Sequence, residues 1–178
     1  MEAEQGELEQ LSSTSGPDAR MTRADVRVVR VSPVSAMATA LIAELDVDLH
    51  ARYPGVAFHT LSPDELMAPA FTFVVAEAAG EALGCGALRV REPGVAEIKR
   101  MFVRPSARRR GVARAVLRAL EARAAELGLP RILIETGAAQ PEAIALYLSS
   151  GYVPIPRYGE YVDVPTSRCF EKRLGAGE

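Results

Sequence analysis

Alternating and periodic apolar positions divide the N-terminal part of the chain into a strand, a helix and a loop. Residues 26–32 (VRVVRVS) alternate as in a half-buried strand. Ser32 and Pro33 then supply a cap and a first helical position. The predicted helix carries its apolar residues on one face: Met37, Leu41, Leu45 and Leu49. Several prolines and Gly55 make residues 52–69 a loop, with one helical turn at SPDELM.

Three strand-like runs follow, at residues 71–78, 82–91 and 96–105, and the turn-prone AAGE and EPGV join them. Short connections of this kind predict an antiparallel meander. In the third run, a period of two residues places Glu97, Lys99, Met101 and Val103 on one face and Ile98, Arg100 and Phe102 on the other. An ion pair between Glu97 and Lys99 is then geometrically easy.

The apolar period changes to about 3.6 residues after Pro105, which predicts a long helix that Gly128 and Pro130 end. Its apolar face holds Ala113, Val116, Leu117, Leu120, Ala124 and Leu127. The pattern then predicts a short buried strand at 131–136, a helix at 141–150 ended by Gly151, and last strands at 152–155 and 167–174. A strand, a helix and another strand in succession predict a parallel crossover, as in α/β domains.

Composition supports one globular domain and excludes several other classes of protein. The 178 residues are 48% hydrophobic and 25% charged, with a formal net charge of -2, which excludes a collagenous or wholly disordered chain. Residues 1–24 are polar and lack periodicity, so we expect a disordered tail before a single domain at residues 25–178. The acidic start and the lack of an apolar run of roughly 18 to 20 residues argue against a signal peptide and a membrane span, which favours a cytoplasmic protein.

The cationic and sulfur-containing residues add two expectations. Arg accounts for 19 of the 21 cationic residues, a bias that, with the abundant Ala, suggests a bacterial source with a GC-rich genome. Cys85 and Cys169 lie far apart, without a CxxC pair or a His at metal-ligand spacing. We therefore interpret both as reduced structural thiols and expect no metal site.

Five Arg residues gather where the third strand of the meander gives way to the long helix: Arg104, Arg108, Arg109, Arg110 and Arg114. A helix start exposes unpaired N–H groups at the positive end of the helix dipole, and Gly111 would let a ligand approach the backbone closely. Taken alone, such a run is most often a solvated or nucleic-acid-binding surface. Because the net charge is slightly negative and no further basic stripe accompanies the run, we favour a phosphate site and expect no nucleic-acid partner.

The sequence contains neither GxxxxGK[ST] nor GxGxxG, which argues against nucleoside triphosphates and dinucleotides. Arg108-x-x-Gly111-x-Ala113 resembles instead the [Q/R]-x-x-G-x-[G/A] pyrophosphate loop of the GNAT superfamily of N-acetyltransferases. EIKRMFVRP resembles the central strand of that family, and PEAIALYLSSGYV resembles its helix with a Tyr shortly before a Gly-aromatic pair. The order of elements matches from about residue 26 to the end. The resemblance implies an α/β GNAT fold with a mixed central sheet of about six to seven strands flanked by helices.

The resemblance also implies acetyl-CoA as co-substrate and places its binding residues. The strand end that binds the pantetheine arm matches Met101, Phe102 and Val103, and the loop that cradles the pyrophosphate matches Arg108, Arg109, Arg110, Gly111, Val112 and Ala113. Many relatives place an Asn shortly after the next strand. This chain has TGAAQ there, so Thr136 or Gln140 would take the polar role.

Two residues match catalytic positions of the family. Tyr147 matches the Tyr that can protonate the departing thiolate, although a Tyr beside Ile144 and Leu148 on a helix is ordinarily a core residue. Glu97 matches a position from which several members supply a general base for the amine. The alternative role for Glu97 is an ion pair with Lys99 or a neighbouring Arg on one face of the sheet.

The acceptor pocket of the family lies between the first helix, the loop after it and the loop before the last strand. The candidate residues there are Tyr53, His59, Arg157, Glu160 and Tyr161, whose mixed charge suits an amine that also carries a carboxylate. The implied reaction is direct acetyl transfer to the primary amine of a small molecule, such as an amino acid or a polyamine, in a ternary complex. A protein or peptide acceptor and a non-catalytic acyl-CoA-binding domain stay open as alternatives. Pairing of a homodimer through the last strands is common among relatives.

Overall fold

The computed structural model describes residues 26–56 and 60–175, so the predicted tail at residues 1–24 lies outside the described part of the chain. Its strands are β1 (Arg27–Arg30), β2 (Phe71–Ala78), β3 (Glu81–Glu92), β4 (Val95–Val103), β5 (Arg131–Gly137), β6 (Val153–Ile155) and β7 (Ser167–Arg173). Its helices are α1 (Ala36–Arg52), α2 (Val112–Glu126) and α3 (Pro141–Leu148), with short 3₁₀ turns at Glu65–Met67, Pro105–Ala107 and Gly159–Tyr161.

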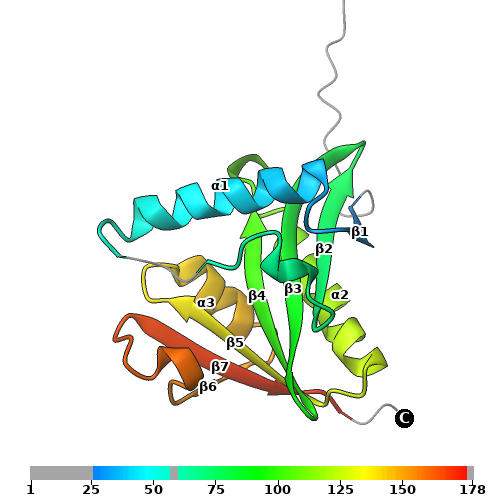
Figure 1. The fold of residues 1–178 in the computed structure, drawn as a ribbon. Coiled ribbons are helices and arrows are strands. Elements are labelled where there is room, and N and C mark those ends of the chain that lie inside the picture. Colours follow the sequence, from blue (N-terminus) through cyan, green and yellow to red (C-terminus); the bar gives the residue numbers. More distant parts are fainter. Residues whose placement is uncertain (1–25, 57–59, 176–178) are drawn as a thin grey trace, which may run out of the picture.

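The strands join in one mixed sheet, in the order β1-β2-β3-β4-β5-β7-β6 (Figure 1). Strands β2, β3 and β4 are antiparallel neighbours, which confirms the predicted meander. Strands β4 and β5, which α2 connects, are parallel, as the crossover predicts. Strand β7 lies between β5 and β6 and is antiparallel to both. The predicted α/β fold with a mixed sheet is therefore confirmed, and a homodimer paired through the last strands stays a prediction.

Helices cover both faces of this sheet (Figure 1). Helix α1 buries Ala38, Leu41, Ile42 and Leu45 against one face, which we call the α1 face. Helices α2 and α3 cover the opposite face, which we call the α2/α3 face, with Val116, Leu117, Leu120 and Tyr147 among their buried side chains. Burial of one such aliphatic side chain contributes about 1.5 to 3 kcal/mol, so the two clusters hold the sheet between the helices.

Strand β4 contains a bulge at Arg100, which corrects the predicted faces of this strand. Between two of its pairs with β3, strand β4 has one residue more than its neighbour, and Arg100 adopts a left-handed conformation with φ of 59°. As a result, Met101 and Val103 pack on the α2/α3 face, and Phe102 packs under α1. The predicted alternation holds as far as Lys99 and is wrong beyond it.

Strands β4 and β5 separate after the pair Ile98↔Ile134. Beyond this pair, β5 continues alongside β7 as far as Gly137↔Ser167, while β4 stays with β3. A strand that loses its neighbour leaves N–H and C=O groups without a ladder partner on that side. The carboxyl ends of β4 and β5 therefore form the two lips of a wedge that can receive an extended ligand.

Three further sequence expectations concern features away from this wedge. Cys85 and Cys169 are free and buried, and burial raises the pKa of the Cys85 thiol to about 12, which fits a structural role. Within residues 26–56 and 60–175, no helix is both long and apolar enough to cross a bilayer. The same residues contain no cluster of three or more His, Cys, Asp or Glu that could hold a metal ion.

Candidate active site

A cavity of about 280 Å³ lies where β4 and β5 separate, and its walls belong to both faces of the sheet. Leu45 and Leu49 of α1 line it on the α1 face, and Tyr147 of α3 lines it on the α2/α3 face. Residues 99–101 of β4 and 134–137 of β5 form the walls between them. Two ligands that approach from opposite faces of the sheet can therefore meet at this point.

Tyr147 belongs to the core and to the cavity wall at the same time. Its side chain is buried, and its ring packs against those of Tyr152 and Phe170, with centroids 6.0 and 6.1 Å away. Burial, with the charge of Glu135 nearby, raises the pKa of the Tyr147 phenol above its ordinary value. The phenol therefore carries its proton at neutral pH, as a general acid must.

Three predicted cofactor residues line the cavity: Met101, Thr136 and Gln140. The side-chain oxygen of Gln140 accepts hydrogen bonds from Thr136 Oγ1 and from the backbone N–H of Gly137, both at 3.2 Å. Thr136 and Gln140, which the sequence offered as alternatives, are thus held together at the end of β5. Phe102 instead lies in the core beneath α1, so its contribution to a ligand site would come from its backbone.

The loop before α2 has the backbone conformation of an anion-binding turn. Gly111, directly before the helix, has a φ of 84°, and Arg109 is also left-handed, with a φ of 63°. Left-handed residues in a turn allow successive N–H groups to converge on an anion. No side chain of the described residues caps the start of α2, where Val112 and Ala113 form the first turn. The loop therefore retains N–H donors and the positive end of the helix dipole for a phosphate group.

The five Arg side chains around this loop have different roles. Arg104 and Arg108 reach α1 and form ion pairs with acids there. Arg114 donates a hydrogen bond to the end of α3. Arg109 and Arg110 are exposed at the loop. Because three of the five Arg side chains contact α1 or the end of α3, fewer of them are available to bind nucleic-acid phosphates than the sequence suggests.

Glu97 is fully buried on the α1 face of β4, among cations and phenols. Lys99 Nζ lies 3.4 Å and Arg91 Nη1 lies 3.1 Å from its carboxylate oxygens. The hydroxyls of Tyr158 and Tyr161 donate to the same carboxylate at 3.0 and 3.4 Å. Glu97 is not among the described residues that line the cavity. The ion pair that the sequence offered as the alternative to a base role is thus present.

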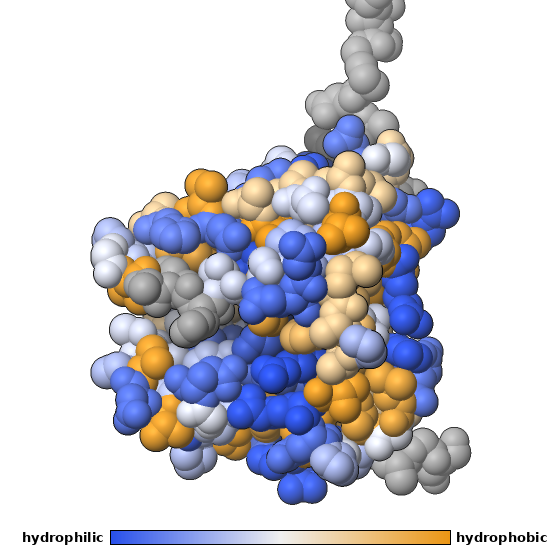
Figure 2. Space-filling view, in the orientation of Figure 1, coloured by the Kyte–Doolittle hydropathy of each residue, from blue (hydrophilic) through white to orange (hydrophobic). Residues whose placement is uncertain are grey.

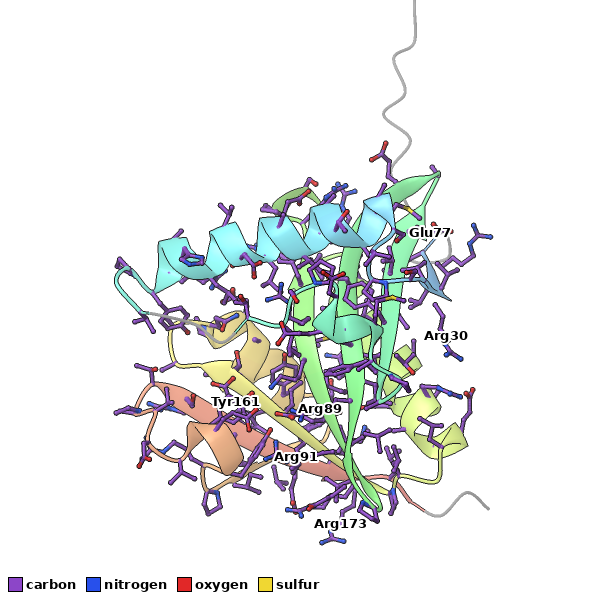
Figure 3. The ribbon with its side chains drawn as sticks, viewed as in Figure 1. Arg30, Glu77, Arg89, Arg91, Tyr161 and Arg173 are labelled. Carbon is purple, nitrogen blue, oxygen red and sulfur yellow. The ribbon has the colours of Figure 1, made fainter. Side chains whose placement is uncertain are left out.

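This cluster extends over the part of the α1 face that α1 leaves open. Figure 2 shows hydrophilic side chains gathered below α1, and Figure 3 shows Arg89, Arg91 and Tyr161 on this side of the sheet. Glu160 bridges Arg91 at 3.3 Å and Lys99 at 3.2 Å. Burial alone would raise the pKa of Glu160, but its own backbone hydrogen bond and these two cations lower the pKa to about 2. Glu160 is therefore ionised and already paired.

The predicted acceptor residues are only partly brought together. Tyr53, Glu160 and Tyr161 line the cavity. Arg157 lies at a separate depression beside β6 and β7 and donates to the carbonyl oxygen of Val164 at 3.0 Å, which corrects its predicted place in the acceptor pocket. His59 lies outside the described residues.

Sequence reasoning missed Glu135, which also lines the cavity. Ile132 and Ile134 pack on the α2/α3 face, so alternation along β5 turns Glu135 to the α1 face. Its carboxylate accepts a hydrogen bond from the Ser167 hydroxyl, and burial raises its pKa above the ordinary value of a glutamate. The available signal was a carboxylate directly after the buried apolar residues 132–134 of β5, because carboxylates are rarely drawn into such surroundings without a partner or a function.

Comparisons with known proteins agree with this geometry. The model of the acetyltransferase (GNAT) family matches residues 39–152. An IAA acetyltransferase of Azospirillum brasilense is 38% identical to this chain over 151 residues, which make up 84% of this chain and 99% of that protein.

Solved structures share the fold. A crystal structure from Klebsiella pneumoniae subsp. pneumoniae, provisionally named an acyl-CoA N-acyltransferase, has a TM-score of 0.72 and 32% identity, covering 85% of this chain and 99% of that one. A GNAT family acetyltransferase from Elizabethkingia anophelis, solved with acetyl-CoA bound, has a TM-score of 0.64 over 84% of this chain and 99% of its own. Its identity to this chain is 16%, so this second likeness concerns the fold alone.

Proposed function

Because the chain belongs to the GNAT family of acetyltransferases, we propose that it transfers the acetyl group of acetyl-CoA to the primary amine of a small molecule, by direct attack in a ternary complex. The observation that carries this proposal is the cavity between β4 and β5, whose walls belong to both faces of the sheet. Both substrates can be present there at once, so the protein needs no covalent relay between them.

The residues present fit acetyl-CoA as the co-substrate, which would supply an activated thioester. The N–H groups of residues 108–113, with the exposed Arg109 and Arg110, would hold the pyrophosphate. At Met101 and Val103 the edge of β4 is no longer paired with β5. This edge would bind the pantetheine arm as it would bind a neighbouring strand. Thr136 and Gln140 would add polar contacts from the opposite lip.

The proton movements of the reaction support the role of general acid for Tyr147. An amine of Lys type has a pKa of about 10.4, so a first proton must leave the ammonium before the nitrogen can attack the acetyl carbon. The C–N bond forms as the C–S bond breaks, and Tyr147 donates its phenolic proton to the departing sulfur. Tyr147 recovers a proton from the nitrogen of the new amide, so the enzyme returns to its starting state. The first proton passes through a carboxylate base to water.

Glu97→Gln tests which of its two roles Glu97 has. We expect it to destabilise the protein by about 3 kcal/mol, because Lys99 and Arg91 would then lie beside a neutral side chain. Activity should fall by a similar factor at every pH, with acetyl-CoA affinity hardly changed. Thermal melting and the pH–rate profile are the measurements. A loss largest at neutral pH, at an unchanged melting temperature, would assign the base role to Glu97.

Release of the CoA thiol tests the proposed function directly. The acceptor panel should include amino acids, polyamines, aminoglycosides and peptides, and also IAA, after the name of the Azospirillum brasilense relative. We expect turnover with a small primary amine and an N-acetylated product by mass spectrometry. A Lys-containing protein acceptor is less well supported, because the surface beside the cavity carries Arg89 and Arg91 where such an acceptor would need an acidic groove. A folded protein that binds CoA but acetylates nothing in the panel would support a non-catalytic acyl-CoA-binding domain.

A further inference from the structure

Glu135 is the one acid of the cavity wall, among the described residues, that forms no ion pair. Glu160, the other acid of this wall, is already bridged by two cations. The cations of the wall, Lys99 and Arg100, are also paired with acids. Glu135 is half-buried. Because a carboxylate withdrawn from water without a cation partner is unfavourable, proteins retain one where a ligand or a reaction needs it.

Glu135 and Tyr147 border the cavity from opposite faces of the sheet. Ile134 packs on the α2/α3 face, so its neighbour Glu135 lies on the α1 face, whereas Tyr147 comes from α3. On the α1 face, Leu45 and Leu49 of α1 add apolar side chains to the cavity wall. Tyr147, which can donate a proton to the thioester sulfur, and Glu135, which can bind a cation, thus lie on opposite sides of the cavity.

We propose that Glu135 binds the ammonium group of the acceptor and takes its first proton. This inference rests on the proposed acetyl transfer and names the base for it. The Ser167 hydroxyl donates its hydrogen bond to Oε1 of Glu135, so Oε2 can accept a hydrogen bond from the ammonium group. The proton passes from the nitrogen to Glu135 and then to water. The free amine forms the N–C bond with the acetyl carbon, the C–S bond breaks, and the sulfur takes its proton from Tyr147. Tyr147 then recovers a proton from the nitrogen of the new amide.

The surroundings of Glu135 make its carboxylate a stronger base than an exposed glutamate, because they raise its pKa. Burial raises the pKa of its carboxyl, and the charges of Glu97 and Glu160 add to the rise, while the Ser167 hydroxyl and Lys99 lower it. The titratable groups that face it come from every element around the cavity: Tyr53 directly after α1, Glu97 and Lys99 of β4, Tyr147 of α3, Cys169 of β7, and Glu160 and Tyr161 of the 3₁₀ turn. Activity should therefore fall on acidification at a pH above the usual range of a glutamate.

A single unpaired acid also limits the chemical class of the acceptor. One ammonium group can pair with Glu135, while the apolar body of the molecule contacts Leu45 and Leu49. A second ammonium group would find no further unpaired acid among the described residues of this wall, because Glu160 is already paired with Lys99 and Arg91. The acceptor is thus a primary monoamine on an apolar body, and a polyamine is disfavoured.

Glu135→Gln tests the proposal because Gln keeps the size of the side chain and can still accept the Ser167 hydrogen bond, but cannot take the proton. With 2-phenylethylamine as acceptor and saturating acetyl-CoA, we expect kcat/KM to fall about 100-fold or more at neutral pH. The loss should shrink at high pH, where more of the amine is already deprotonated. The thermal shift caused by acetyl-CoA should not change. Spermidine should be acetylated by the wild type at least about tenfold less efficiently than 2-phenylethylamine.

Thermal melting separates this role from a structural one. Because folding raises the pKa of Glu135, its carboxyl stabilises the folded protein below the unfolded pKa, and this contribution is lost as the pH rises through the folded pKa. Above that pH, Glu135→Gln should melt at the same temperature as the wild type or higher, in contrast to Glu97→Gln. An unchanged kcat/KM, or an equal loss at every pH with a lower melting temperature, would overturn the proposal. Spermidine turned over as well as 2-phenylethylamine would overturn the acceptor class.

A wild type that acetylates no amine would contradict the proposed function, and a direct titration then decides the role of Glu135. In protein labelled with ¹³C at the Glu carboxyls, the Glu135 signal is the one that Glu135→Gln lacks. Adding 2-phenylethylammonium to the CoA complex should shift this signal and lower its titration midpoint, since an adjacent cation favours the carboxylate. A signal that does not respond would overturn the proposal.

Discussion

Tyr147→Phe should slow acetyl transfer by about 100-fold to 10,000-fold, the range expected when a positioned general acid is removed. The substitution deletes only the hydroxyl, so the ring keeps its packing against Tyr152 and Phe170 and stability should change little. The penalty should shrink with a thioester donor whose thiol is more acidic than that of CoA, because a better leaving group needs less protonation. The measurement is the turnover of both proteins with the two donors.

Tyr152→Phe is the matched control for this experiment. Its ring lies 6.0 Å from that of Tyr147 in the same core, yet Tyr152 is not among the described residues of the cavity wall. We expect this variant to keep the wild-type rate. Unchanged turnover in Tyr147→Phe would leave Tyr147 as a core residue only. So would an equal penalty for both donors when chemistry limits the rate.

Gly111→Val should abolish the stabilisation of the protein by acetyl-CoA, which is about 2.7 kcal/mol at a ligand concentration of about 100 times Kd. With a φ of 84°, this position disfavours a branched side chain, and Val would fill the space beside the N–H groups that are to hold the pyrophosphate. The measurement is the melting temperature with and without acetyl-CoA.

Gly128→Val separates backbone strain from loss of the phosphate site. Gly128 follows the opposite end of α2 with a φ of 66°, and a side chain there would meet open space. We expect this variant to be strained in the same way as Gly111→Val but to keep the full shift with acetyl-CoA. A folded Gly111→Val protein with the full shift would show that the phosphate site lies elsewhere.

Sequence patterns predict nearly every helix and strand here, because each element buries one periodic face. The bulge at Arg100 escapes prediction, since no Gly or Pro marks it and a single inserted residue turns Met101 and Val103 to the other face. Local motifs also place Gly111 before α2 and Tyr147 on α3, because the residues that define each motif are close together in the sequence.

Contacts between distant segments account for what the sequence did not predict about the site. Glu97 sits in a buried cluster that Tyr158 and Tyr161 complete from far along the chain, so its position on a strand gave no sign of these partners. Glu135 directly follows a short apolar run, and its access to a cavity depends on how β4 and β5 separate. The place of Arg157 depends on the loop between β6 and β7, which has no periodicity to read.

Direct transfer in a ternary complex at the opening between β4 and β5 is tested most directly by initial rates of thiol release, with acetyl-CoA and the amine both varied. The intact mass of the protein after incubation with acetyl-CoA alone completes the measurement. We expect intersecting double-reciprocal lines, an N-acetylated amine and an unmodified protein. Parallel lines, with a protein one acetyl group heavier, would contradict direct transfer.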